Sequence, residues 1–172
     1  ATATPIPQGI FLNELLPDPR TVDWDSDGQP GWLDEWIELY NAADVPASLG
    51  GWALHDATTA YTITQGTIIW PHSYLLLFRR QTGLALGDWR DEVRLVRPDG
   101  VVADHMAYDY TPDPDRSYCR SEDGGGYWTK ECEVTPGRAN QLTPKRVQPA
   151  ATPAPAWPTG AATLADVRTA PH

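Results

Sequence analysis

The sequence predicts an all-β chain that folds as an antiparallel sandwich or barrel. Short runs of alternating apolar and polar residues, or of β-branched and aromatic residues, recur along the chain. Seventeen prolines and fourteen glycines separate these runs, and no apolar stripe of helical period and useful length is present. The hydrophobic fraction of 41% suffices for a core, and 172 residues indicate one domain of ordinary size with additional material.

The first half of the chain contains six predicted strands. The first is IFLNELL at 10–16, which ends before Pro17 and Pro19 because proline cannot continue a hydrogen-bonded ladder. An acidic loop follows, and then WIELYN at 36–41 alternates with period two, as a strand with one buried face does. After a turn segment, ADVPASLGG at 43–51, four further strands are expected: WALHD at 52–56, YTIT at 61–64, TIIW at 67–70 and YLLLF at 74–78.

A hairpin is predicted over residues 91–108. RDEVRLVR and VVADHMAY flank the turn PDG at 98–100, whose residue types favour chain reversal. RSYCR at 116–120 is predicted to be the last regular strand. Eight or nine short strands with turns between them favour a sandwich or barrel.

The composition divides the chain into four segments. Residues 1–8 are a Pro/Thr/Ala linker, and 9–140 form the domain. Residues 141–163 are rich in proline and alanine, and we expect a disordered, extended tail there. Residues 164–172 are the start of a following segment or a disordered end. Because the chain begins at Ala1, we expect a fragment or processed chain that is covalently linked to further domains.

The order of several motifs resembles the lamin tail domain family. The motifs are NELLPDP, an Asp/Gly-rich loop, DEWIELYN, LGGWALHD, GTIIWPHSYLLLF, DEVRLVRPDGVVADHMAY, RSYCRSEDGGGYW and TPGRAN. The resemblance covers roughly residues 8–140, and the bacterial, extracellular type fits best. It implies an immunoglobulin-like antiparallel β-sandwich without catalytic residues of its own, so we expect no enzyme. It also implies that Trp52 packs in the core and that Pro136 and Gly137 end the last strand.

The charge distribution excludes one class of partner. The formal net charge is −10, and nine acidic residues between Glu14 and Asp44 face Arg20 as the one basic residue of that stretch. Nucleic acids require clusters of Lys and Arg, so we expect no nucleic-acid partner. The acidic surface fits a cation or a basic protein segment, or serves solubility alone.

Cys119 and Cys132 flank a glycine-rich segment. We predict a disulfide between them, with two buried free thiols as the alternative. Together with the Lys-poor, Trp-rich composition, the pair favours an extracellular, secreted or cell-surface location. No run approaches the ~18 apolar residues that span a membrane, so direct membrane insertion is not expected.

The stretch DWDSDGQPGWLDEW at 23–36 carries the main candidate site. Asp23, Asp25 and Asp27 alternate, and such residues can turn three carboxylates toward one Ca²⁺ ion, with Asp34 or Glu35 completing the shell. An EF-hand is excluded because its twelfth position is Asp34 rather than Glu and strands flank the loop. The alternative is a solvated acidic turn whose charges are screened by salt.

Two tryptophans accompany this loop. Trp24 and Trp32 could stack on a sugar or on a partner side chain, or could simply cover the end of the sandwich. Three functions therefore stay open. The first is a non-enzymatic structural or protein-interaction module with an unidentified protein or surface partner. The second is a calcium-dependent binding module for a surface glycan or protein, and the third is an accessory domain of a secreted nuclease or phosphatase.

Overall fold

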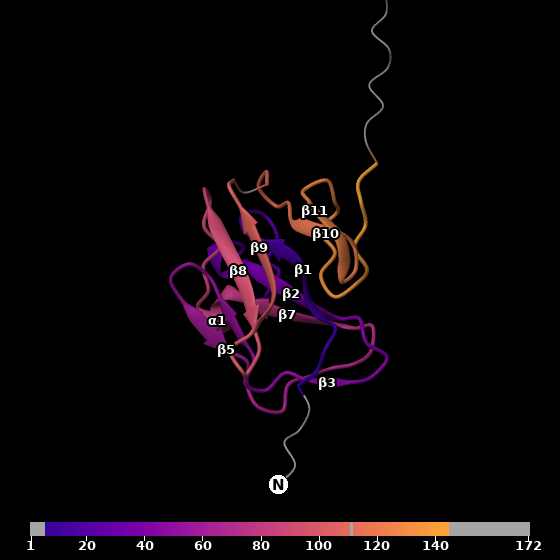
Figure 1. Ribbon diagram of the computed structural model, residues 1–172. Helices are drawn as coiled ribbons and strands as arrows, with labels where there is room; N and C mark the ends of the chain where they lie inside the picture. The colour runs from indigo at the N-terminus through magenta and orange to yellow at the C-terminus, as the bar shows by residue number, and fades with distance from the viewer. Residues whose placement is uncertain (1–5, 111, 145–172) are drawn as a thin grey trace, which may run out of the picture.

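The computed structural model describes residues 6–110 and 112–144. Within these ranges the chain forms an antiparallel β-sandwich of the immunoglobulin-like type, with two sheets facing each other (Figure 1). The predicted fold class is therefore confirmed. Residues 145–163 of the predicted tail 141–163, the predicted segment 164–172 and the first five residues of the N-terminal linker lie outside the described residues.

The larger sheet has five strands in the order β11-β10-β1-β2-β7. Their bounds are β1 (Ile10–Leu16), β2 (Trp36–Asn41), β7 (Tyr74–Phe78), β10 (Tyr118–Glu122) and β11 (Gly125–Thr129). The register of β1 against β2 shifts between Leu12 and Glu14, which marks a β-bulge at Asn13. The bulge places Glu14 directly opposite Glu38 of β2.

The second sheet has four strands in the order β5-β4-β8-β9. Their bounds are β4 (Ala53–His55), β5 (Ala60–Thr62), β8 (Asp91–Val96) and β9 (Val102–Tyr108). The predicted hairpin is confirmed: Gly100 has φ +83° and donates its N–H to the Arg97 carbonyl. A separate pair, β3 (Ala47–Ser48) with β6 (Ile68–Ile69), lies beside the sandwich.

The core fills the space between the two sheets. Alternate residues of β8, Val93 and Leu95, are fully buried, and Trp52 is buried among them as the family resemblance implies. Burying side chains of this size contributes about 1.5–3 kcal/mol each, so the core provides most of the driving force for folding.

Four elements differ from the sequence prediction. RSYCR is not the last regular strand, because β11 pairs with β10; its two glycines hide the strand signal. The predicted turn segment 43–51 contains β3, and YLLLF is followed by a short helix, α1 (Arg79–Thr82), which ends at Gly83 with φ +73°. A 3-10 turn, η1 (Trp32–Asp34), precedes β2.

Residues 131–143, which we call the C-terminal clasp, fold back on themselves beyond β11. Cys132 and Leu142 form an isolated β-bridge, the Glu133 N–H donates to the Gln141 carbonyl, and the Thr143 N–H donates to the Glu131 carbonyl. Backbone pairing thus continues three residues past the predicted domain boundary at residue 140.

Candidate functional site

The acidic loop connects β1 to β2, and its own carboxylates shape its turns. Asp23 accepts hydrogen bonds from the N–H groups of Asp27 (3.1 Å) and Gly28 (2.8 Å), and Asp27 accepts one from Gln29 (2.8 Å). Gly28 has φ +92°, a conformation that suits glycine. Short aspartate side chains favour such turns because they can bond to backbone groups a few residues on.

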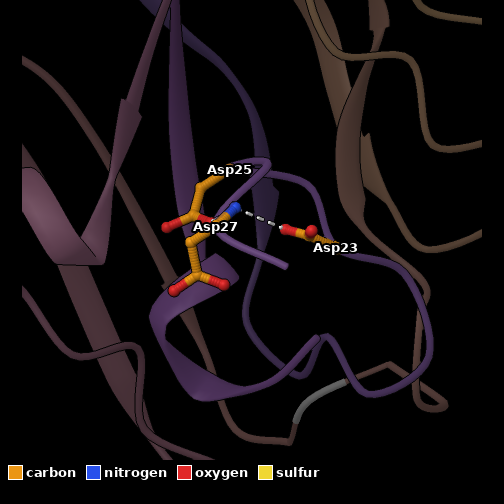
Figure 2. Close-up of side chains that lie close together, drawn as sticks. All are labelled: Asp23, Asp25 and Asp27. Carbon is orange, nitrogen blue, oxygen red and sulfur yellow. Dashed lines mark hydrogen bonds between the residues drawn. The ribbon is translucent and has the colours of Figure 1, made fainter. Parts of the chain in front are cut away.

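Three of the five predicted ligands lie together. Asp23, Asp25 and Asp27 each offer one carboxylate oxygen, and these oxygens lie within 4.8 Å of one another. Figure 2 shows the three side chains side by side, with the Asp27 N–H bonded to Asp23. All three are partly buried, so their mutual repulsion is not fully screened by water.

An arginine that the sequence analysis did not consider contacts this cluster. Arg80 of α1 pairs with Asp25 through Nη1 and with Asp27 through Nη2, both at 3.2 Å. Its guanidinium supplies one positive charge to the carboxylates. The sequence does show two consecutive arginines after YLLLF. It gives no indication that one of them contacts a loop more than fifty residues away.

Asp34 lies apart from the cluster and organises the loop instead. Its carboxylate is fully buried; Oδ1 accepts from the N–H groups of Trp24 (2.6 Å) and Asp25 (2.8 Å), and Oδ2 accepts from Gly31 (2.8 Å). Both oxygens therefore already accept backbone hydrogen bonds, which hold the Asp34 carboxylate within the loop, apart from the cluster of Asp23, Asp25 and Asp27.

Glu35 points toward α1 and the segment before β8. Its carboxylate accepts from Arg79 Nη1 at 2.6 Å and from the Leu86 N–H at 2.7 Å. Burial raises the pKa of Glu35 to about 7, although these two bonds counteract the rise. The predicted calcium shell placed Asp34 or Glu35 beside the cluster, but both acids form their bonds elsewhere. Metal binding at any of the five residues stays a prediction.

A groove of about 560 Å³ opens beside Glu35. Pro17, Pro19, Trp32 and Asp88 line it. Trp32 is 61% exposed, and the Arg79 guanidinium lies 4.5 Å from the centre of its ring. Trp24 is half-buried in the loop, so of the two predicted stacking residues Trp32 is the one presented to solvent.

Two further exposed aromatic residues, Trp89 and Tyr110, contact each other near the groove in sequence and in space. Trp89, next to Asp88, is 74% exposed, and Tyr110 is 60% exposed; their rings meet edge to face with centres 5.7 Å apart. We define the acidic end of the molecule as residues 17–35, 79–91, 109–110 and 112–116. These segments hold eleven acidic residues and five arginines, together with Trp32, Trp89 and Tyr110.

Two buried glutamates outside the acidic end hold the clasp against the larger sheet. Glu14 accepts from Ser117 Oγ and from the N–H and Oγ1 of Thr135, and Glu38 accepts from Asn13 Nδ2 (3.0 Å) and from the Gly137 N–H (2.6 Å). Burial raises the pKa of both carboxyls, that of Glu38 to about 8. The TPG motif therefore secures the clasp, a role that sequence reasoning did not identify.

Cys119 and Cys132 are both fully buried and are free thiols in this structure. Contact with Cys132, together with burial, raises the pKa of the Cys119 thiol. The structure therefore brings the two residues together between β10 and the clasp, and the disulfide between them stays a prediction.

Comparison with known proteins gives one match. A family model described as Lamin Tail Domain matches residues 4–110, which include both sheets except β10 and β11. No curated protein and no solved structure matches the chain significantly. Among the described residues, no helix has the length and apolar character needed to cross a membrane.

Proposed function

Because the chain belongs to the lamin tail domain family, we propose that it serves as a non-enzymatic structural and protein-interaction module of a secreted or cell-surface protein. The family comprises non-catalytic immunoglobulin-like domains, which supports the non-enzymatic part. The location rests on the composition and the cysteine pair, which are typical of exported domains.

The observation that carries the interaction function is the exposed aromatic set at the acidic end. Trp32, Trp89 and Tyr110 each expose at least 60% of their surface. Tryptophan and tyrosine are the residues most often found at the energetic centre of protein interfaces, where neighbouring groups exclude water. Exposure alone does not distinguish them, since Tyr127 is 65% exposed. However, Trp89 and Tyr110 pack against each other, and Trp89 follows Asp88, which lines the same groove as Trp32. Such a cluster favours a partner that covers it.

The buried carboxylates support a structural rather than a catalytic role. Asp34, Glu35 and Glu38 each accept at least one backbone N–H, and each holds a loop or the clasp in place. A general acid or base must reach a substrate proton, and Asp34 and Glu38 are fully buried. Glu35 lines the groove, but Arg79 and the Leu86 N–H hold its carboxylate.

Site-specific photocrosslinking tests the interaction function. A benzophenone amino acid is placed at Trp32, at Trp89, or at Tyr127, which is 65% exposed on β11 and lies outside the acidic end. In the cells that produce the protein, we expect discrete protein adducts from positions 32 or 89 and none from 127. Equal labelling at all three positions, or no adduct at any, would contradict the proposal.

A membrane-impermeant biotin reagent tests the location on the same cells. Lys130, in the described part of the chain, should react without lysis if the module is secreted or displayed at the surface. Modification only after lysis would rule out an external location.

An activity assay tests the non-enzymatic part of the proposal. If the purified chain hydrolyses a phosphomonoester or DNA, and if substitution of one of its own residues abolishes that activity, the non-enzymatic part is refuted.

A second candidate function is calcium-dependent binding, favoured by the proximity of the Asp23, Asp25 and Asp27 carboxylates. Calcium prefers hard oxygen ligands, and three carboxylates in one loop supply half of a six-ligand shell. Arg80 opposes binding because it already neutralises part of the charge. An ion would displace its guanidinium and could order the loop next to Trp32.

Calorimetric titration with CaCl₂ distinguishes this candidate from a salt-screened turn. We expect heat and a rise in Tm for the parent chain, loss of both in Asp25→Asn with Asp27→Asn, and tighter binding in Arg80→Gln, because the competing cation is removed. Glu133→Gln, an exposed acid in the clasp, is the matched control. Absence of heat in both the parent chain and Arg80→Gln would eliminate the calcium site.

A further inference from the structure

The groove beside Trp32 has the shape and chemistry of a site for a basic peptide. We propose that it binds an extended segment of a partner protein, with an arginine or lysine side chain lying between the exposed face of Trp32 and the Asp88 carboxylate. The inference rests on the proposed interaction function and names the site and the chemical class of its ligand.

The groove has room for an extended chain. Its volume of about 560 Å³ lies within the range of ligand sites, which is about 300–1,000 Å³. Pro17 and Pro19 line it together with residues 85–88. Proline rings have fixed backbone geometry and no N–H, so this part of the groove is a rigid apolar surface with few groups that need a hydrogen-bond partner.

The charges in the groove favour a cation. Both arginines that line it already face an acid: Arg20 pairs with Asp18 at 2.9 Å and Arg79 with Glu35 at 2.6 Å. Asp88 is exposed and, among the described residues, forms no ion pair within 4.0 Å, although its charge acts on Arg20 at longer range. The remaining charge in the groove is therefore negative, and the excess of acids at the acidic end would steer a basic segment toward it.

Trp32 already shows that it accepts a guanidinium. Arg79 lies over the ring at 4.5 Å from its centre, and the side chain still exposes 61% of its surface. A cation over a tryptophan face contributes about 0.5–2 kcal/mol, more when the pair is shielded from water. A second arginine on the open side of the ring, held by Asp88, would extend this stacking.

Four blocked octapeptides with the same alternating proline backbone provide the test. (Arg-Pro)₄, (Lys-Pro)₄, (Gln-Pro)₄ and (Glu-Pro)₄ favour an extended conformation and differ in charge. They are titrated into the full chain at 150 mM NaCl, with calorimetry for affinity and NMR for location. We expect (Arg-Pro)₄ to bind at least tenfold more tightly than (Gln-Pro)₄, with amide shifts concentrated at residues 85–88 and at Trp32.

Variants then separate the groove from general charge attraction. Trp32→Ala and Asp88→Asn should each weaken (Arg-Pro)₄ binding about tenfold, which matches the loss of one cation–π or one ion-pair contact. Tyr127→Ala and Glu133→Gln are matched controls, an exposed aromatic and an exposed acid outside the acidic end, and should leave affinity within twofold. Because Asp88 is exposed, Asp88→Asn should leave the fold intact. It therefore still tests the groove if Trp32→Ala alters folding.

Several results would overturn the inference. The first is that (Glu-Pro)₄ binds more tightly than the other three peptides. The second is that the control variants lose as much affinity for (Arg-Pro)₄ as Trp32→Ala and Asp88→Asn do. The third is that chitohexaose displaces (Arg-Pro)₄ from the parent chain but not from Trp32→Ala, which would identify a glycan site. If none of the peptides binds while the crosslink from position 89 persists, the groove inference fails and the interaction function stands. If the crosslinks are absent as well, the interaction function itself fails.

Discussion

At the scale of single residues, Asp34 has the largest effect on the acidic loop. Its buried carboxylate accepts three backbone N–H groups, from Trp24, Asp25 and Gly31. Asp34→Ala should destabilise the chain by about 2–4 kcal/mol, because three partly buried backbone donors lose their acceptor. Asp113→Ala, an exposed acid of the same end, should change stability by less than about 0.5 kcal/mol. Urea denaturation of both variants measures the difference, and equal midpoints would refute the anchoring role.

Glu38 should make stability depend on pH. Burial raises its pKa from 4.5 to about 8 in the folded chain, so the folded state holds a proton that the unfolded state has released. The resulting stability is fully present below pH 4.5 and is lost as pH rises toward 8. Glu14 and Glu35 are shifted in the same direction. Between pH 5 and 8 we expect the free energy of unfolding to fall by about 1–3 kcal/mol.

Thermal melts across this pH range, with Glu38→Gln as the test variant, check the assignment. The variant cannot titrate at position 38, so its Tm should vary less with pH than that of the parent chain. A parent chain whose Tm rises steadily from pH 5 to 8 would show the opposite sign and disprove the assignment.

Sequence reasoning at this scale succeeds where the contacts are local. The clustering of Asp23, Asp25 and Asp27 follows from their alternation in one loop, and the structure places them together. The role of Glu35 depends on Arg79 and Leu86, which are distant in sequence, whereas Asp34 bonds to backbone groups of its own loop. A single sequence contains no signal for such pairings, because they are set by how the sheets pack.

At the scale of elements, the C-terminal clasp should be required for stability. Truncation after Pro144 should leave Tm unchanged, whereas truncation after Asn140 removes the partners of Glu131, Cys132 and Glu133 and should lower Tm by several degrees. Truncation after Lys130 uncovers the buried carboxylates of the sheet and should prevent stable folding. Calorimetry of the three truncated chains measures the order, and equal Tm values for the first two would show that the pairing beyond residue 140 contributes nothing.

The predicted disulfide belongs to the same element. A Cys119–Cys132 bond would tie β10 to the clasp and, for a loop of this length, would add about 3 kcal/mol in the chain-entropy model. We expect the protein purified without reductant to lose about two mass units relative to its reduced form and to melt at a higher temperature. Two thiols that react with a maleimide after unfolding without reductant would exclude the bond.

The elements that the sequence did not reveal are short or contain glycine. β11 includes Gly125 and Gly126, and β3 has two residues, so neither carries a run of β-formers long enough to recognise. The longer strands, β1, β2, β8 and β9, lie close to their predicted bounds. Burial alternates in β8, but all six residues of β2 are buried, so the prediction of one buried face for 36–41 was wrong, because β2 lies inside the larger sheet and both of its faces are covered.

At the scale of the whole molecule, charge repulsion should limit stability. The net charge is −10, and more than half of the excess is gathered at the acidic end. Raising NaCl from 20 to 200 mM shortens the screening length and should raise Tm by about 1–3 °C. Melts at constant pH check this, with Na₂SO₄ at matched ionic strength separating screening from other salt effects. A Tm that falls with NaCl would show that the ion pairs of Arg79 and Arg80 outweigh the repulsion.

The fold class could be predicted from the sequence because short strands, turn residues and the absence of helical periodicity agree along the chain. The pairing order of the strands could not, because the order β11-β10-β1-β2-β7 joins segments more than one hundred residues apart. The resemblance to a known family supplied the immunoglobulin-like arrangement. The groove beside Trp32 became visible only once the β1–β2 loop and the segment between β7 and β8 were placed together.

The clasp also determines how the domain would carry mechanical load. Tension applied at Pro144 reaches the bonds between Thr143 and Glu131 and between Glu133 and Gln141 first, and it would open them one at a time. The next resistance comes from the two buried glutamates, which hold the clasp at Thr135 and Gly137. The clasp would thus unfold and extend under force before the sandwich does. A disulfide at Cys132 would limit the length of chain that this unfolding releases.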